Sequence, residues 1–186
     1  FFENFIGRSE AFLRRVYPKL QELYPIYGDI DFDTFYRGVN EAKPSLIRIE
    51  ADELTYSLHI IIRYELEKAL IQGTLSVDEL PAAWNEKYKE YLGLDVPTNA
   101  KGVLQDVHWA GGSFGYFPSY ALGLIYAAQL TEALKVDLPQ FETLIQDGEI
   151  EPVKTWLQEN VHQYGKRLTP NELIQKVTGQ EISVQP

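Results

Sequence analysis

The chain has 186 residues, 45% of them hydrophobic, which is enough to bury the core of one moderate-sized domain. Its 27 acidic residues outnumber 17 Lys and Arg, and the net charge of −10 argues against nucleic acid or an anionic membrane as the main partner. Cysteine is absent, which excludes disulfides and thiolate chemistry. No apolar run reaches the roughly 18 residues of a membrane span, and no signal peptide opens the chain, so we expect a cytoplasmic location.

The first fifty residues contain two predicted helices and one β-like run. Apolar residues recur at helical spacing up to about residue 20, in a helix that Pro18 should kink. A shorter helix is predicted over 31–42, with acidic residues at its start. The segment 45–49 resembles a short strand interrupted by Arg48. Such an Arg either forms a weak surface ion pair or holds a carboxylate at two points.

The segment 50–72 gives the clearest helix, with a continuous apolar stripe and Gly73 placed to end it. His59 and Arg63 lie four residues apart on one face of this helix, with Tyr56 nearby. His59 is not followed by the Glu and second His of a metal-binding helix. We therefore expect a hydrogen-bonded, structural histidine.

The remaining helices are read from caps and apolar runs. A capping box at 76–79 opens a helix that ends near Gly93, and the small apolar residues of 118–134 predict a helix buried on most sides. Three more helices are predicted over 138–146, 151–164 and 169–178. The tail after Gly179 should be loose. The sequence therefore predicts one mainly α region over 1–186, with at most a short β hairpin.

The stretch 102–120 differs from ordinary helix packing. His108 stands beside Trp109, and two tyrosines, Tyr116 and Tyr120, precede an apolar helix. Three glycines between them relax the backbone: Gly111, Gly112 and Gly115. A His with nearby Tyr hydroxyls is suited to stabilising developing negative charge. The alternative is a tight turn with packed rings and no function.

Two segments resemble signature motifs of the carboxypeptidase Taq family, of the thermostable carboxypeptidase 1 type. Residues 47–52 match I-R-x-x-A-D, and residues 102–109 match G-x-x-Q-D-x-H-W, at every fixed position. The segment 1–9 resembles the residues directly after the family's H-E-S-Q motif, and the end of the chain, through 169–172, resembles the family's C-terminus. The resemblance implies a helical, neurolysin-like (gluzincin) metallopeptidase fold, a homodimer, and removal of single residues from peptide C-termini with broad specificity.

The resemblance also implies a metal site that this sequence lacks. The family binds zinc through H-E-x-x-H and H-E-S-Q, and the Glu of the first motif is the general base. The three histidines, His59, His108 and His162, stand outside any H-E-x-x-H. We therefore expect the C-terminal, substrate-binding portion of a larger catalytic domain, inactive alone and without bound metal. The full-length parent would hold zinc or another divalent metal such as cobalt.

The matching positions imply roles for seven residues. Arg48 would hold the terminal carboxylate of a peptide substrate, because a guanidinium grips a carboxylate at two points. His108 would stabilise the tetrahedral oxyanion or bind the substrate backbone, with Tyr116 or Tyr120 as a second donor. Three residues should orient the loop and the histidine rather than touch substrate: Asp52, Gln105 and Asp106.

Two other hypotheses remain open. The chain could be a non-catalytic helical module that binds peptides or forms dimers; a start codon near Phe1 would favour this, whereas an upstream H-E-x-x-H would favour the enzyme. A plain helical bundle without a site is the third hypothesis, but it does not explain why Arg48, His108 and Tyr116 occur in motifs that packing does not require.

Overall fold

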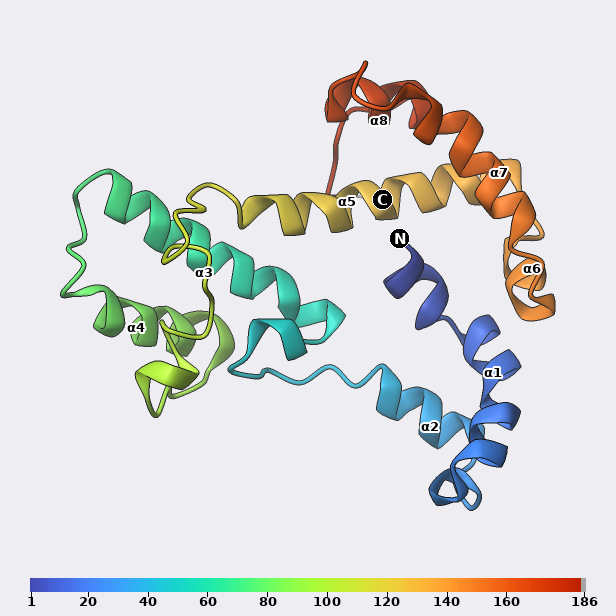
Figure 1. Ribbon diagram of the computed structural model, residues 1–186, viewed down its shortest axis with the longest axis horizontal. Helices are drawn as coiled ribbons and strands as arrows, with labels where there is room; N and C mark the ends of the chain where they lie inside the picture. The colour runs from blue at the N-terminus through green and yellow to red at the C-terminus, as the bar shows by residue number, and fades with distance from the viewer. Residues whose placement is uncertain (185–186) are drawn as a thin grey trace. The chain divides into compact units, whose positions relative to one another are not determined.

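The computed structural model describes residues 1–184, and its regular elements are helices (Figure 1). The predicted mainly α class is confirmed, and no strand forms in this range. The α-helices are α1 Glu10–Leu23, α2 Phe32–Val39, α3 Glu53–Ile71, α4 Leu80–Leu92, α5 Pro118–Asp137, α6 Phe141–Asp147, α7 Glu151–Asn160 and α8 Pro170–Thr178. A π-helix, η1 Phe2–Gly7, and four short 3₁₀ turns complete the set: η2 Pro25–Tyr27, η3 Arg48–Glu50, η4 Asn99–Lys101 and η5 His162–Tyr164. Among the described helices, none combines the length and apolar character that crossing a membrane requires.

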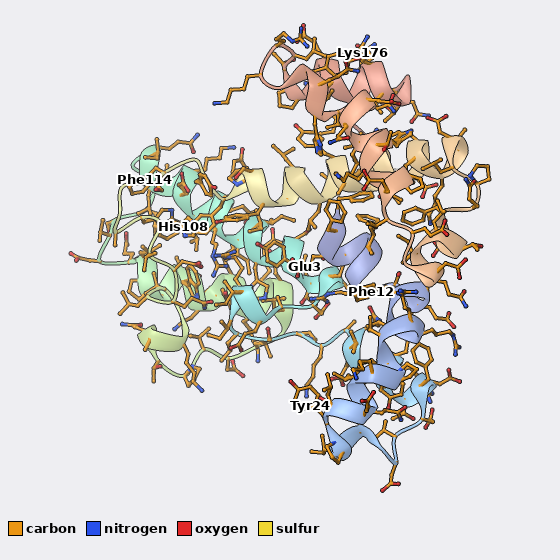
Figure 2. All side chains as sticks on the ribbon, turned by 45° about the vertical axis from the view of Figure 1, so that its right-hand side comes forward. Glu3, Phe12, Tyr24, His108, Phe114 and Lys176 are labelled. Atoms are coloured by element: carbon orange, nitrogen blue, oxygen red, sulfur yellow. The ribbon has the colours of Figure 1, made fainter. Side chains whose placement is uncertain are left out.

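The chain divides into two compact units, and the first contains Phe1–Val39 and the chain from Gly123 onward. In this unit α1 packs against α2 and α6. Its core consists of Ile6, Leu134, Phe141, Ile145, Val153, Trp156 and Leu157. Tyr24 follows α1 and is exposed (Figure 2).

The end of the chain is more ordered than expected. The Gln129 amide donates to the Glu181 carbonyl at 3.0 Å and accepts from the Ser183 N–H at 3.2 Å. The predicted looseness after Gly179 is therefore wrong as far as Ser183. The part of that prediction that concerns residues 185–186 lies outside the described residues.

The second unit, Asn40–Leu122, contains the sequence motifs. Helices α3 and α4 lie side by side in it (Figure 1). Six buried side chains form its core: Ile62, Leu66, Leu80, Trp84, Tyr88 and Leu92. The expectation that 1–186 form one domain stays a prediction.

Local caps set the ends of α3 and α8. The Asp52 carboxylate accepts from the Thr55 N–H at 2.9 Å and so caps α3, and Gly73 follows its end with a φ of +70°. The capping box predicted at 169–172 forms, with Glu172 bonding back to the Thr169 N–H at 2.7 Å. Local hydrogen bonding therefore fixes where these helices begin and end.

Three local expectations are corrected. The N-terminal helix breaks at Ser9, whose hydroxyl caps α1, and α1 continues through Pro18. The strand expected over 45–49 is wrong, because η3 begins at Arg48 and the Arg48 N–H donates to a side-chain amide instead of a neighbouring strand. Helix α5 is not buried on most sides: its buried residues are Ala127, Thr131 and Leu134.

Candidate functional site

Arg48 holds a carboxylate of its own chain. Its Nε and Nη2 donate to Asp106 Oδ1 at 3.1 and 2.7 Å, and its Nη1 donates to the Tyr56 hydroxyl at 2.9 Å. Its backbone N–H donates to Gln105 Oε1 at 3.1 Å. With 5% of the residue exposed, the surface ion pair considered for Arg48 is wrong. The motif segments 47–52 and 102–109 are thus joined through both the main chain and the side chain of one arginine.

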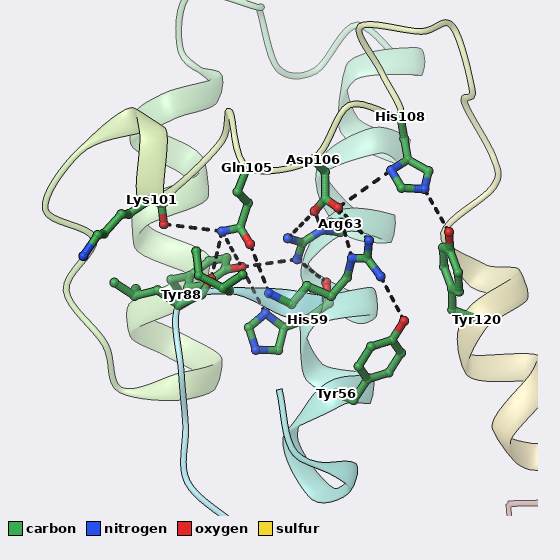
Figure 3. Close-up of polar contacts among 12 residues, drawn as sticks. Tyr56, His59, Arg63, Tyr88, Lys101, Gln105, Asp106, His108 and Tyr120 are labelled. Carbon is green, nitrogen blue, oxygen red and sulfur yellow. Dashed lines mark hydrogen bonds and ion pairs between the residues drawn. The ribbon is translucent and has the colours of Figure 1, made fainter. Parts of the chain in front are cut away.

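A second guanidinium holds the other oxygen of the same carboxylate. Arg63, on α3, is fully buried, and its Nε and Nη2 lie 2.6 and 2.5 Å from Asp106 Oδ2. Its Nη1 donates to the His59 carbonyl at 2.8 Å, within the same helix. Asp106 therefore lies between two arginines, one on each oxygen. Figure 3 labels Asp106 and Arg63.

The charges in this cluster are strongly coupled. Burial alone would raise the pKa of Asp106, but hydrogen bonds and charge from Arg48 and Arg63 hold it below its usual range. Burial alone would lower the pKa of Arg48, and Asp106 more than offsets this, so that pKa is raised. Both shifts favour the charged forms of Arg48 and Asp106, and a guanidinium such as that of Arg63 carries a positive charge in proteins. The trio of Arg48, Arg63 and Asp106 thus carries one positive charge in excess.

Aromatic rings surround the two guanidinium groups. The Cζ of Arg48 lies 4.9 Å from the ring centre of Tyr120 and 5.7 Å from that of Phe117. The Cζ of Arg63 lies 4.6 Å from the Trp84 ring and 5.4 Å from the Phe117 ring. Ring faces attract cations at these distances, so the rings stabilise the excess positive charge while excluding water.

His108 lies beside this cluster and brings both predicted tyrosines with it. Its Nε2 is 3.0 Å from the Tyr120 hydroxyl, and its ring centre is 5.7 Å from that of Tyr116. Its Nδ1 is 3.7 Å from Asp106 Oδ1, too far for a hydrogen bond. The structure therefore brings His108, Tyr116 and Tyr120 together (Figure 3 shows the first and last).

A buried glutamate of α3 fixes the glycine-rich loop. The Glu67 carboxylate accepts from Trp109 Nε1 at 3.0 Å and from the Gly115 N–H. Gly115 has a φ of +75°, a backbone conformation that favours glycine. Phe114 lies half exposed in this loop (Figure 2), and its ring stacks on that of Trp109 with the ring centres 6.4 Å apart. The loop therefore has the packed rings expected of a structural turn. It also carries His108 beside the arginine cluster, as the hypothesis of a functional loop requires.

The residues expected to orient the site occupy two places. Gln105 and Asp106 bond directly to Arg48, whereas Asp52 bonds to the Thr55 and Lys43 backbone at the start of α3. Burial alone would raise the pKa of Asp52. Hydrogen bonds, chiefly those from Thr55, outweigh this effect, so the pKa lies below its usual value. Asp52 thus holds the segment that carries Arg48 and does not contact His108.

Sequence reasoning assigned no role to five residues in or beside the site: Tyr56, Arg63, Glu67, Tyr88 and Phe117. One signal was present in α3, where His59, Arg63 and Glu67 follow one another at four-residue intervals on one face. The expectation of a hydrogen-bonded His59 is confirmed, since its Nδ1 lies 3.0 Å from the Tyr88 hydroxyl. Tyr88 and Phe117 gave no signal because they resemble ordinary core residues.

Within residues 1–184, no group of three His, Cys, Asp or Glu side chains is arranged to hold a metal ion. The acidic residue at the centre of the site, Asp106, is already held by two arginines. The described side chains of this site therefore do not fit a divalent cation.

Comparison with known proteins matches residues 1–186 to the family model described as carboxypeptidase Taq (M32) metallopeptidase. The chain is 56% identical to "Carboxypeptidase 1" of Bacillus subtilis (strain 168) over 99% of its own length, and 46% identical to "Thermostable carboxypeptidase 1" of Thermus thermophilus, also over 99%. It covers 37% and 36% of these relatives. The solved M32 carboxypeptidase from Deinococcus radiodurans R1 superimposes with a TM-score of 0.94 at 39% identity, over 99% of this chain and 37% of that one.

Proposed function

Since the chain belongs to the carboxypeptidase Taq (M32) family, we propose that it forms the substrate-binding portion of a metal-dependent carboxypeptidase. The chain spans little more than a third of the length of the relatives it matches. The proposal therefore concerns a longer protein in which this chain binds the C-terminal end of a peptide.

The excess positive charge beside Arg48 carries the proposal. The hydrogen bonds of its guanidinium to described residues use three of five N–H groups, which leaves two for a carboxylate. Arg63 is fully buried and Asp106 already neutralises one charge, so an added carboxylate at Arg48 would balance the trio of Arg48, Arg63 and Asp106. A peptide with a free C-terminus brings such a carboxylate, and a C-terminal amide does not.

The His108 group would act on the peptide carbonyl next to that carboxylate. Tyr120 is engaged with His108 Nε2 and thereby orients the ring. The Tyr116 hydroxyl makes no hydrogen bond with described residues, and the residue is 50% exposed. We assign Tyr116 as the donor to the developing oxyanion, together with His108, and Tyr120 as the residue that positions His108.

The described residues do not account for the metal that a metallopeptidase uses. A divalent ion in a metallopeptidase polarises the scissile carbonyl and activates water. The described side chains do not fit such an ion, so we assign no step of this kind to them. Zinc or cobalt in the parent protein, inactivity of the chain alone, a homodimer and a cytoplasmic location stay predictions. The alternative of a non-catalytic peptide-binding or dimerisation module stays a prediction as well.

The test uses the longer protein with zinc or cobalt added, and compares one short peptide as free acid and as C-terminal amide. We expect cleavage of the free acid only. Arg48→Met should raise KM for the free acid, and Tyr116→Phe should lower kcat by about 10²-fold. Arg14→Met, which removes an exposed ion pair with Glu10, is the matched control and should leave both constants unchanged. Equal cleavage of acid and amide, or an unchanged KM in Arg48→Met, would show that Arg48 does not bind the carboxylate.

A further inference from the structure

The Tyr88 hydroxyl is a junction that the proposed function does not use. Tyr88 is fully buried on α4, and its oxygen lies near three nitrogens. These are His59 Nδ1 at 3.0 Å, Arg63 Nη1 at 3.3 Å and Gln105 Nε2 at 3.4 Å (Figure 3). One hydroxyl thus links α3, α4 and the loop that carries the motif 102–109.

The orientation of the Gln105 amide is set by its other neighbours. Its Oε1 accepts from the Arg48 N–H at 3.1 Å, and its Nε2 donates to the Leu46 carbonyl at 2.8 Å. Reversing the amide would put a donor against a donor and an acceptor against an acceptor, so both bonds would be lost. Gln105 therefore presents an N–H group, and not an oxygen, to Tyr88.

The direction of the remaining bond is determined by counting protons. A phenol has one proton to donate and two lone pairs that accept. Arg63 carries only donors, and Gln105 Nε2 is a donor that lies 3.4 Å from both the Tyr88 hydroxyl and the Lys101 carbonyl, so neither residue can accept the Tyr88 proton. The single Tyr88 proton must then go to His59 Nδ1, which has to be unprotonated.

We propose that His59 is a positioning residue, held as the neutral Nε2–H tautomer so that it accepts the Tyr88 proton. This bond turns the Tyr88 lone pairs toward Arg63 and Gln105. Those two residues in turn hold Asp106 and the Arg48 backbone. The effect on catalysis rests on the proposed function, whereas the hydrogen-bond direction does not.

The other protonation states of His59 fit the contacts less well. An Nδ1–H group would leave the Tyr88 proton without an acceptor, and it would add a donor to an oxygen that Arg63 and Gln105 already approach with N–H groups. The proposed tautomer leaves one group, Nε2–H, without a partner among the described residues. An imidazolium would also add charge to a cluster that already has one positive charge in excess.

The surroundings keep both groups in the required state. Burial lowers the pKa of His59 to about 4, assisted by the charges of Arg63 and Arg48, while Asp106 and Asp52 act in the opposite direction. Burial raises the pKa of Tyr88, so the phenol keeps its proton at neutral pH. Both shifts preserve one neutral donor and one neutral acceptor.

Nitrogen NMR of the 186-residue chain tests the direction of the bond. The chain has three histidines, so the His59 signals are assigned from spectra of His108→Gln and His162→Gln. We expect a pyridine-like Nδ1 and a pyrrole-like Nε2–H for His59, unchanged between about pH 7 and pH 5. In Tyr88→Phe, which removes only the hydroxyl, Nδ1 should lose its hydrogen-bond shift and the His59 titration should move to higher pH. A protonated Nδ1 in the wild type, or His59 signals unchanged in Tyr88→Phe, would overturn the proposal.

Kinetics of the longer, metal-loaded protein test the positioning role. Tyr88→Phe should lower kcat/KM for a free-acid peptide roughly tenfold, because the groups that hold Arg48 and Asp106 lose a fixed partner. Tyr91→Phe is the matched control: its hydroxyl, also on α4, bonds to Glu65 outside the cluster, and both constants and the His59 signals should stay unchanged. If the Tyr88→Phe variant has the same kcat/KM as the wild type, positioning by Tyr88 is refuted. The urea midpoint of the variant is recorded to show how much its stability changes. An inactive wild-type enzyme would refute the proposed function, while the nitrogen signals alone decide the bond direction.

Discussion

Replacing Asp106 by Asn tests how strongly the two arginines depend on one carboxylate. The substitution keeps the shape of the side chain, removes its charge, and replaces one of its two accepting oxygens by an NH2 group that would face an arginine. Arg48 and Arg63 then lie with no counter-charge, although each keeps its neutral partners, the Tyr56 hydroxyl and the His59 carbonyl. The Asp106 side chain is 11% exposed, so solvent screens little of this loss. Removing one partner of a buried ion pair lowers the free energy of unfolding by about 3–5 kcal/mol.

Urea unfolding followed by tryptophan fluorescence measures this loss. The chain has three tryptophans, and a Trp156→Phe background leaves only Trp84 and Trp109, both in the same unit as Asp106. For a loss of about 4 kcal/mol and a slope of about 2 kcal/mol per M, the midpoint should fall by about 2 M. Adding Arg48→Met to Asp106→Asn should recover part of the loss, because it relieves the repulsion between the two guanidinium groups.

Asp95→Asn is the matched control for the same change of charge. Asp95 pairs with Lys89 at 2.8 Å, but its side chain is 87% exposed, so its removal should cost less than about 1 kcal/mol. If Asp106→Asn destabilises the chain no more than Asp95→Asn, the buried cluster is not the strongly coupled trio described above.

Three further predictions concern other parts of the chain. Glu67→Gln replaces one of two accepting oxygens, which should speed hydrogen exchange at the Gly115 amide and lower the unfolding free energy by about 1–3 kcal/mol; exchange at the wild-type rate would contradict the clamp. Thr169→Ala removes a capping box and should lower the unfolding free energy by about 1 kcal/mol; amide hydrogen exchange should become faster in α8 and stay unchanged in the other helices. Because the His59 pKa is about 4 when folded and near 6.5 when unfolded, the unfolded state binds more protons between these values. Stability should therefore fall by about 1.4 kcal/mol per pH unit as the pH drops through this window, and an identical slope in His59→Gln would rule His59 out as the cause.

The sequence determined the helices because their signals are local. Periodic apolar residues, the Thr169 cap and the glycines that end helices all act over a few residues, and the structure places them as indicated. Two short motifs likewise indicated the family, and the match of the whole chain to the family model confirms it. A local pattern failed at 45–49, where the residues read as a strand but strand formation needs a partner that lies elsewhere in the chain.

Only the tertiary structure decided which polar groups meet. Arg48 and Asp106 are 58 positions apart, and Tyr88 is 29 positions from His59; no periodicity relates such residues. Arg48 was expected to bind a substrate carboxylate. In the fold it also binds the carboxylate of Asp106, whose other oxygen is bound by Arg63. The residues that carry charge could be named from the motifs. Their pairing, their burial and the excess positive charge arise because α3, α4 and the loop before α5 bring distant side chains into one water-poor cluster.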